Sequence, residues 1–407
     1  MLGKEFAGDV EDGHARIWQG RSVGPDDGEG FMNSRERVLA ALDHRTPDRP
    51  PRDLGSTTAT GIHPLAYKAL KRYLGLEGGW RYLSARAQLA RVEPPVVERF
   101  GIDVLPLVPE AAAVPPVLDD RRCYVDRWGV ERRLPGEGGH YYVSRPPLAS
   151  AERVGDLDAF SWPEPQVDLA ALGQQARHLR ETTDKALVLN LEVGFLHQTQ
   201  FLRGYDGWLM DLASAPAFAA ALMDRVLEIW LAEAEATIRA VNGHADVVVY
   251  ADDIAFQDRP MVSPGMYRSL IRPRQKRVFD LMKRSGLKVF YHSCGNVWPL
   301  IGDLVEMGVD VLNPVQVSAG EMGDTAALKR TWGEELTFWG GIDTQHVLPR
   351  GTPEEVRREV WRRLDDLAGG GGCVLAGVHD IQPEVPPENI CAMFEAADEW
   401  PAFAGPA

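Results

Sequence analysis

The chain has 407 residues and carries 44 Lys and Arg against 59 Asp and Glu, which gives a formal net charge of −15 at pH 7. This acidic balance argues against nucleic acid or an anionic membrane surface as the main partner. With 44% hydrophobic and 25% charged residues, the composition is that of a soluble globular protein. No stretch approaches the ~18 consecutive apolar residues of a membrane helix, and no secretory signal precedes the first predicted helix, so we expect a cytoplasmic protein.

The N-terminal residues 1–31 are rich in Gly and acidic residues and show no sustained apolar period. We interpret them as a disordered leader, or as sequence upstream of a start at Met32. Order is expected to begin with a helix, since Asn33 and Glu36 form a capping-box pattern ahead of apolar residues at helical spacing. Residues 32–407 are predicted to form one domain.

Short apolar runs alternate with longer segments of helical period along most of the chain. Six runs begin near residues 186, 245, 287, 309, 336 and 373, and two earlier candidates begin near residues 50 and 102. Strands that alternate with helices imply parallel pairing through crossover helices. Eight such units predict an α/β fold of the (β/α)8 TIM-barrel type. An open doubly wound sheet is the alternative, although no GxGxxG motif follows an early strand.

One segment departs from this rhythm. Residues 121–147 contain two aromatic-rich runs on either side of a Gly-rich turn. This pattern predicts a β-hairpin inserted before the third barrel strand.

Polar residues gather where the predicted barrel strands end. The carboxyl ends of parallel barrel strands share one face, where the functional residues of such barrels lie. The residues at these positions are Glu192, Asp252, Asp253, His292, Cys294, Asn313, Gln316, Asp343, Gln345, His379 and Asp380.

The most specific of these patterns is His292-Ser293-Cys294. Residues two apart in a strand point to the same face, so an imidazole nitrogen and the Cys294 thiolate can reach one ion, and zinc suits such mixed ligands. A third ligand would be His379 or, as an alternative, Cys373, and we prefer His379 because it lies nearer the carboxyl end of the last strand. The competing interpretation is a small buried cysteine beside a hydrogen-bonded histidine.

The remaining candidates are carboxylates and amides. We expect one of Asp252 and Asp253 to face the mouth as base or anchor and the other to cap a loop, with Glu192 as a further catalytic candidate. Amides suit the orientation of a polar substrate, so Asn313 and Gln316, together with Asp343 and Arg52, are the substrate-binding candidates. Hydrogen bonding within the loops is the alternative for the amides. The full set comprises catalytic Asp253, Asp252 and Glu192; substrate-binding Asn313, Gln316, Asp343 and Arg52; and metal-binding His292, Cys294 and His379.

Six segments resemble the uroporphyrinogen decarboxylase superfamily. In chain order they read MNSRERVLAALDHRTPDRPP, RWGVERR, FLRGYDGWLMDLASAP, YHSCGNVWPLIGDLVEMGVDVLNPVQ, LTFWGGIDTQHVLPRGTPEEV and VLAGVHDIQPEVPPENICAMFEAA. The resemblance runs from about Met32 to the C-terminus. It implies a (β/α)8 barrel and one of two chemistries: cofactor-free decarboxylation of a tetrapyrrole, or zinc-dependent transfer of a methyl group between a corrinoid protein and a thiol.

Two motifs favour the methyltransferase branch. The decarboxylases carry an arginine-rich RxPxWxMRQAGR run, where this chain reads DRPPRDLGSTTATG and keeps only Arg49 and Arg52. The methyltransferases use a His-x-Cys pair and a distant Cys, which resembles His292 and Cys294, with His379 in the distant position. The resemblance therefore implies Zn2+ and a methylcobamide carried on a separate corrinoid protein. A cofactor-free uroporphyrinogen decarboxylase is the runner-up, and a non-catalytic ligand-binding barrel is the third possibility.

Overall fold

The computed structural model describes residues 31–136, 138–164, 169–191, 193–241 and 243–401. The predicted leader at 1–31 falls outside these residues, apart from Phe31. From Met32 onward the chain forms one compact unit.

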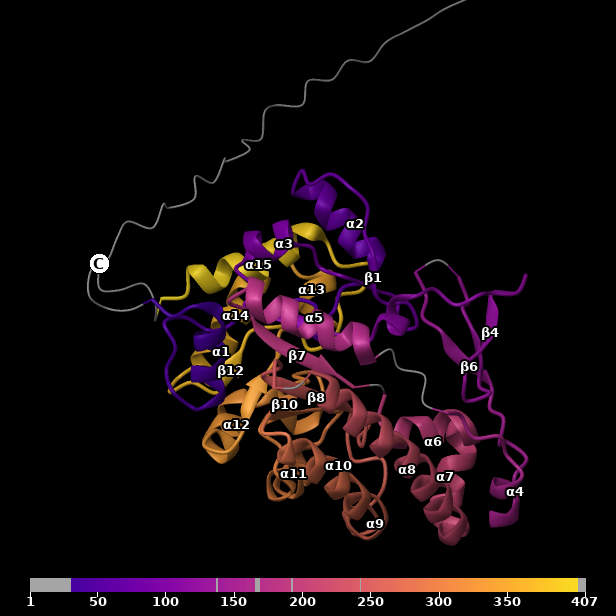
Figure 1. Ribbon diagram of the computed structural model, residues 1–407. Coiled ribbons are helices and arrows are strands. Elements are labelled where there is room, and N and C mark those ends of the chain that lie inside the picture. Colours follow the sequence, from indigo (N-terminus) through magenta and orange to yellow (C-terminus); the bar gives the residue numbers. More distant parts are fainter. Residues whose placement is uncertain (1–30, 137, 165–168, 192, 242, 402–407) are drawn as a thin grey trace, which may run out of the picture. The chain divides into compact units, whose positions relative to one another are not determined.

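The centre of this unit is a parallel sheet whose strands follow one another in chain order (Figure 1). Its strands are mostly buried apolar runs, as expected for a parallel sheet covered by helices. They are β3 (Val104–Leu107), β7 (Ala186–Asn190), β8 (Val247–Ala251), β9 (Lys288–His292), β10 (Val311–Asn313), β11 (Thr337–Trp339) and β12 (Cys373–Val374).

The segment at Arg52 closes this sheet into a barrel. Arg52 forms a parallel bridge with Leu375, just after β12, and its carbonyl accepts a 3.0 Å hydrogen bond from the N–H of Asp103, just before β3. The first predicted strand is therefore present as a single bridging residue between the two edge strands. With this segment the parallel strands number eight, and the predicted (β/α)8 barrel is confirmed.

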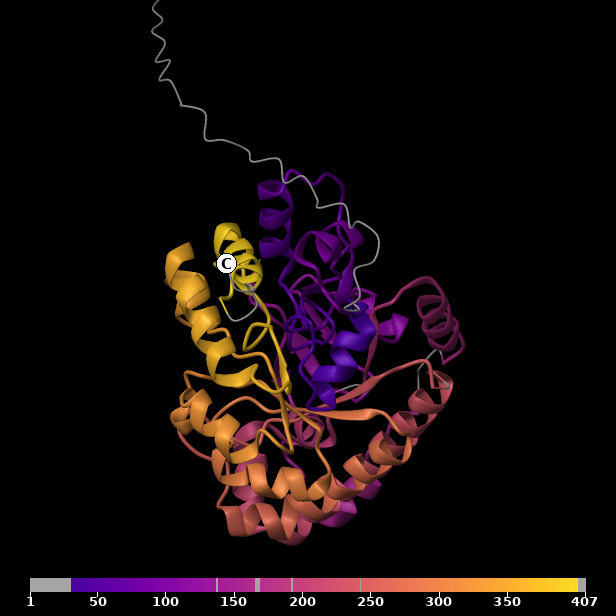
Figure 2. The ribbon, with the colours of Figure 1, turned by 90° about the vertical axis from the view of Figure 1, so that its left-hand side faces the viewer.

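Helices surround the barrel sheet (Figures 1 and 2). The capping box predicted at Asn33 and Glu36 begins the first of them. In the part of the chain that the structure describes, no helix combines the length and hydrophobicity needed to cross a bilayer. The helices are α1 (Ser34–Leu42), α2 (Pro64–Tyr73), α3 (Pro94–Phe100), α4 (Val154–Asp158), α5 (Leu169–Thr182), α6 (Phe195–Arg203), α7 (Tyr205–Ser214), α8 (Pro216–Val241), α9 (Pro264–Met266), α10 (Arg272–Arg284), α11 (Ile301–Met307), α12 (Thr325–Trp332), α13 (Val347–Arg350), α14 (Pro353–Leu367) and α15 (Pro387–Asp398).

The predicted insertion before the third barrel strand is confirmed, and it has one more strand than expected. The antiparallel sheet consists of β4 (Cys123–Val125), β5 (Glu131–Arg133) and β6 (Tyr142–Arg145). The predicted Gly-rich turn joins β5 to β6, whereas β4 pairs with the other edge of β5. Two contacts attach this inserted sheet to the helical layer: Arg127 pairs with Glu233 of α8, and the Arg132 guanidinium lies 4.5 Å from the centre of the Phe201 ring on α6.

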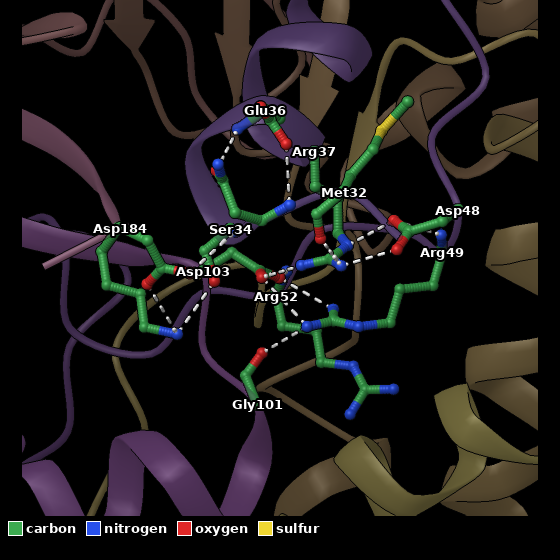
Figure 3. A network of polar contacts seen from close by, with 12 residues as sticks. Met32, Ser34, Glu36, Arg37, Asp48, Arg49, Arg52, Gly101, Asp103 and Asp184 are labelled. Carbon is green, nitrogen blue, oxygen red and sulfur yellow. Dashed lines mark hydrogen bonds and ion pairs between the residues drawn. The ribbon is translucent and has the colours of Figure 1, made fainter. Parts of the chain in front are cut away.

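A network of buried charges lies at the amino ends of the strands (Figure 3). The Asp103 carboxylate is fully buried and accepts hydrogen bonds from Arg37 at 2.8 Å, from both terminal nitrogens of Arg49 at 2.8 and 2.9 Å, and from the peptide N–H of Arg52 at 2.9 Å. Each lone pair that burial removes from water is thus replaced by a donor. We refer to Arg37, Asp48, Arg49, Arg52 and Asp103 as the Asp103 network.

Candidate metal centre at the barrel mouth

Three potential metal ligands converge at the carboxyl ends of the barrel strands. His292 is the last residue of β9, Cys294 follows two residues later, and His379 lies in the loop after β12. One ligand atom from each residue lies within 4.8 Å of the other two, and the two imidazole centres are 5.4 Å apart. We call these residues the ligand cluster.

Hydrogen bonds orient the imidazole of His292. Its Nδ1 lies 2.6 Å from Oδ1 of Asn313, while Nδ2 of the same amide donates a 2.8 Å hydrogen bond to the carbonyl of Trp339. The Trp339 carbonyl fixes which amide atom faces the histidine, so Nδ1 of His292 must donate. Nε2 is then the ring nitrogen that faces the sulfur of Cys294 at 3.6 Å, and it can bind a metal once it has lost its proton.

His379 is oriented in the same manner by a carboxylate. Asp380 accepts a hydrogen bond from Nδ1 of His379 and a 2.6 Å hydrogen bond from Gln382, whose Oε1 in turn lies 2.9 Å from Nε2 of His140. His140 belongs to the loop between β5 and β6. A chain of polar contacts therefore connects the inserted sheet to the ligand cluster, and it leaves Nε2 of His379 available.

The loop that carries Cys294 is held by polar side chains from neighbouring strand ends. Asp253 accepts a 2.7 Å hydrogen bond from the Cys294 N–H, and Gln316 accepts a 2.6 Å hydrogen bond from the N–H of Gly295. Gly295 has φ of +93°, and a Cβ at this position would lie 2.6 Å from two backbone carbonyl oxygens, so only glycine fits.

The donor set and its spacing suit zinc. A zinc ion about 2.3 Å from sulfur and about 2.1 Å from nitrogen, at a tetrahedral angle, holds those two atoms about 3.6 Å apart. The separation between Sγ of Cys294 and Nε2 of His292 is 3.6 Å. Three protein ligands leave a fourth position, and 41% of the His379 side chain is exposed. Such an open position is typical of catalytic zinc rather than structural zinc.

Electrostatics in the cluster favour an ionised thiol. Burial raises the pKa of Cys294, but the charge and hydrogen bond of His292, with a further hydrogen bond from His379, lower it to about 7. For His379, burial by itself would lower the pKa. The charge of Asp380 and its hydrogen bond outweigh burial, so the pKa of His379 is raised. The thiolate form, which is the form that binds metals, is therefore available at neutral pH.

The two candidate aspartates have different environments. Asp252 is fully buried and accepts hydrogen bonds from the N–H groups of Leu196 and His197 at 3.0 and 2.8 Å, so it caps the amino end of α6. Gly194 makes this contact possible, because a Cβ there would lie 2.2 Å from an Asp252 oxygen. Asp252 also accepts from Tyr250. The catalytic role predicted for Asp252 is therefore corrected to that of a helix cap.

Asp253 lies beside the ligand cluster, with Oδ1 at 3.9 Å from Nε2 of His292. Burial opposes its ionisation, but the hydrogen bond and charge of His197 lower its pKa below the usual range. Burial by itself would lower the pKa of His197. Hydrogen bonds and charges from Asp252 and Asp253 outweigh burial and raise the pKa of His197 to about 10. Sequence reasoning missed His197, because its position in the first turn of a helix gives no sign of the contact with strand-end residues.

A cavity of about 500 Å³ opens beside the ligand cluster. Its described lining includes a single arginine, Arg350, and two carboxylates, Asp380 and Glu384. Gln316 lines it as well, although its amide is already bonded to Gly295 and Gln257. The residues at this cavity are Cys294, Gln316, Thr344, Gln345, His346, Arg350, Val378, His379, Asp380, Gln382 and Glu384.

Three further predicted residues do not line this cavity. Arg52 points outward to the helical layer, where it donates to the Phe100 carbonyl at 3.2 Å and pairs with Asp398, so its predicted substrate-binding role is wrong. Cys373 is buried at the amino end of β12, outside the ligand cluster, which excludes it as the third ligand. Asp343 accepts hydrogen bonds from the N–H groups of Gln345 and His346 and shapes the loop instead.

The amide of Asn313 is likewise used within the protein, where it orients His292 as described above. Its prediction as a substrate contact is therefore corrected to a positioning role. Glu192 lies outside the described residues.

The chain is similar to two kinds of curated proteins. The methylcobamide:CoM methyltransferase MtaA of Methanosarcina barkeri is 30% identical over 180 residues, which are 44% of this chain and 49% of that protein. MtbA of Methanosarcina mazei is 26% identical over 257 residues, 62% of this chain and 70% of that protein. The uroporphyrinogen decarboxylase of Thermus thermophilus is 29% identical over 144 residues, 34% and 38% of the two chains. The chain thus spans about half the length of MtaA in that match.

A solved structure shares the fold. A methyltransferase from Methanosarcina mazei superposes with a TM-score of 0.62 at 20% sequence identity, over 90% of this chain and 99% of that one. A family model described as Uroporphyrinogen decarboxylase (URO-D) matches residues 126–400. Because this match covers more than half of the sequence and includes every member of the ligand cluster, the chain belongs to the uroporphyrinogen decarboxylase family.

Proposed function

We propose that this protein is a zinc-dependent methyltransferase that moves a methyl group between a corrinoid protein and a small-molecule donor or thiol acceptor. The observation that carries the proposal is the ligand cluster, in which a thiolate and two oriented imidazoles meet within 4.8 Å at an open mouth. MtaA and MtbA, two relatives of this chain, are named methylcobamide:CoM methyltransferases. The corrinoid is assigned to a separate partner protein.

We assign the residues of the site to three roles: metal binding, orientation of the ligands and electrostatic stabilisation. His292, Cys294 and His379 would hold the ion, which supplies Lewis acidity that keeps a substrate thiol deprotonated at neutral pH. Asn313 and Asp380 fix the two imidazoles in the required orientation. Asp253 stays ionised beside His197 and His292, so we assign it to an electrostatic role rather than to proton abstraction.

The lining of the mouth disfavours the decarboxylase alternative. Uroporphyrinogen carries many carboxylates, and this cavity offers one arginine, Arg350, against Asp380 and Glu384 among its described residues. Arg49 and Arg52, the arginines that remain from the decarboxylase motif, are paired with Asp103 and Asp398. A small thiol makes no comparable demand for positive charge.

The decisive experiment measures zinc content and two activities on the same preparations. We expect about one zinc per chain in the purified protein, loss of zinc in Cys294→Ser, and retention in the control Cys391→Ser, which changes a buried cysteine in α15. Methyl transfer from free methylcobalamin to 2-mercaptoethanol should follow zinc content. A zinc-free protein that decarboxylates uroporphyrinogen equally well with and without Cys294 would replace this proposal with the decarboxylase.

A further inference from the structure

Two arginines face each other across a short ribbon outside the mouth. The strands β1 (Tyr82–Ser84) and β2 (Leu89–Ala90) pair antiparallel, with Tyr82 opposite Ala90. The same register places Arg81 opposite Arg91, whose N–H donates a 2.8 Å hydrogen bond to the Arg81 carbonyl. Directly opposite residues share one face of a ribbon with Cβ atoms roughly 5 Å apart, and like charges in this arrangement are destabilising.

Neither guanidinium has a counter-charge within the described parts of the chain. Arg81 and Arg91 form no ion pair or side-chain hydrogen bond with a described residue, although this protein has an excess of acidic residues. Burial lowers the pKa of Arg91, and the charge of Arg81 lowers it further. The arginines of the Asp103 network show the usual alternative, because Arg37 and Arg49 both pair with a buried carboxylate.

Both arginines line a cavity of about 580 Å³. Val108, Pro115 and Leu172 give it apolar walls, and Gln175 of α5 adds a side-chain amide. Val108 directly follows β3, so the cavity opens near the mouth side of the barrel. None of its lining residues belongs to the cavity beside the ligand cluster.

We propose that this cavity, the Arg81–Arg91 pocket, binds a small organic molecule that bears a phosphate group. Two guanidiniums from opposed strands can each donate paired hydrogen bonds to a dianionic oxyanion, which removes their mutual repulsion. The apolar walls accommodate the organic part of the same molecule. The Gln175 amide supplies a further neutral donor. The binding of such a ligand is independent of the metal centre.

Calorimetric titration of the full-length protein with phenyl phosphate and with inorganic phosphate tests the pocket. We expect saturable binding of phenyl phosphate, tighter than that of inorganic phosphate because only the former fills the apolar part. Arg91→Gln and Arg81→Gln should each weaken binding by about 10- to 100-fold, as expected for loss of a charged hydrogen-bond donor. Arg239→Gln removes one exposed positive charge from α8 and serves as the matched control, with affinity within about twofold.

Thermal unfolding without ligand provides a second readout. Arg81→Gln should not lower the melting temperature of the ligand-free protein, because it removes a like-charge contact. Absence of saturable binding would overturn the proposal, as would an equal loss of affinity in Arg239→Gln. Equal affinity for the two probes would overturn the assignment of an organic ligand. Zinc content should be unchanged in all three variants.

Discussion

The Asp103 network and the ligand cluster are both groups of ionisable side chains at the ends of the barrel strands, and they differ in how their lone pairs are used. In the Asp103 network, the carboxylate meets donors from Arg37, Arg49 and the Arg52 backbone, so its oxygens are satisfied (Figure 3). In the ligand cluster, Asn313 and Asp380 occupy one nitrogen of each imidazole and leave the other directed at Cys294. The Asp103 carboxylate is thus fully hydrogen-bonded, whereas each ligand imidazole at the mouth keeps one nitrogen that its orienting partner does not occupy, which distinguishes a stabilising cluster from a reactive one.

Removal of Asp103 should produce the largest effect on stability. Asp103→Ala leaves Arg37 and Arg49 buried without their shared counter-charge, so we expect the free energy of unfolding to fall by about 3–5 kcal/mol. Denaturant unfolding of the metal-free protein measures this loss. The control Glu306→Ala breaks an exposed ion pair with Arg272 and should cost less than about 1 kcal/mol. Equal effects of the two substitutions would show that the Asp103 network is not a stabilising element.

A methyl group at Gly194 should disturb the contact between Asp252 and the amino end of α6. In Gly194→Ala the new Cβ would meet the Asp252 carboxylate that caps α6, and the resulting displacement should cost about 1–3 kcal/mol of unfolding free energy. Gly155→Ala is the control, because a Cβ there meets no atom within 4 Å. Crystallography of the variant should show α6 or Asp252 displaced. Unchanged stability would contradict the role of Asp252 as a tightly packed cap.

Loss of an orienting carboxylate should weaken metal binding without abolishing it. Asp380→Asn keeps an acceptor for His379 but removes the charge, so we expect about 10- to 100-fold lower zinc affinity, measured by competition with a chromophoric chelator. Glu384→Gln makes the same charge change in the same cavity without a hydrogen bond to a ligand residue. A similar decrease in both variants would indicate a general charge effect rather than orientation of His379.

Substitution of Cys294 should have the smallest effect on stability. Cys294→Ser should remove zinc and leave the free energy of unfolding nearly unchanged, whereas Asp103→Ala should lower that free energy. A partly exposed residue in a mouth loop contributes little to packing, so Cys294→Ser should change the unfolding free energy of the metal-free protein by less than about 1 kcal/mol while zinc is lost. The comparison between the two clusters fails if Cys294→Ser unfolds the metal-free protein.

The barrel and the ligand cluster could be predicted from the sequence because both depend on local pattern. Buried strands appear as apolar runs, and in a parallel barrel each run ends on the same face, which places His292, Cys294 and His379 together without knowledge of their contacts. The roles of Arg52 and Asp252 could not be predicted in this way. Whether Arg52 or its neighbour Asp53 faces inward depends on the phase of a single bridging residue, and Asp252 caps α6, a helix from the preceding unit.

The contact between His140 and Gln382 makes the barrel and its insertion interdependent parts. The loop between β5 and β6 contacts the residues that orient His379, so the three-stranded sheet is connected to the ligand cluster as well as to the helical layer. In a chimera that receives this segment from a relative, transfer of the strands alone would remove His140, the hydrogen-bond partner of Gln382. Exchange of the insertion between family members therefore has to preserve one histidine contact if the geometry of the mouth is to be inherited with it.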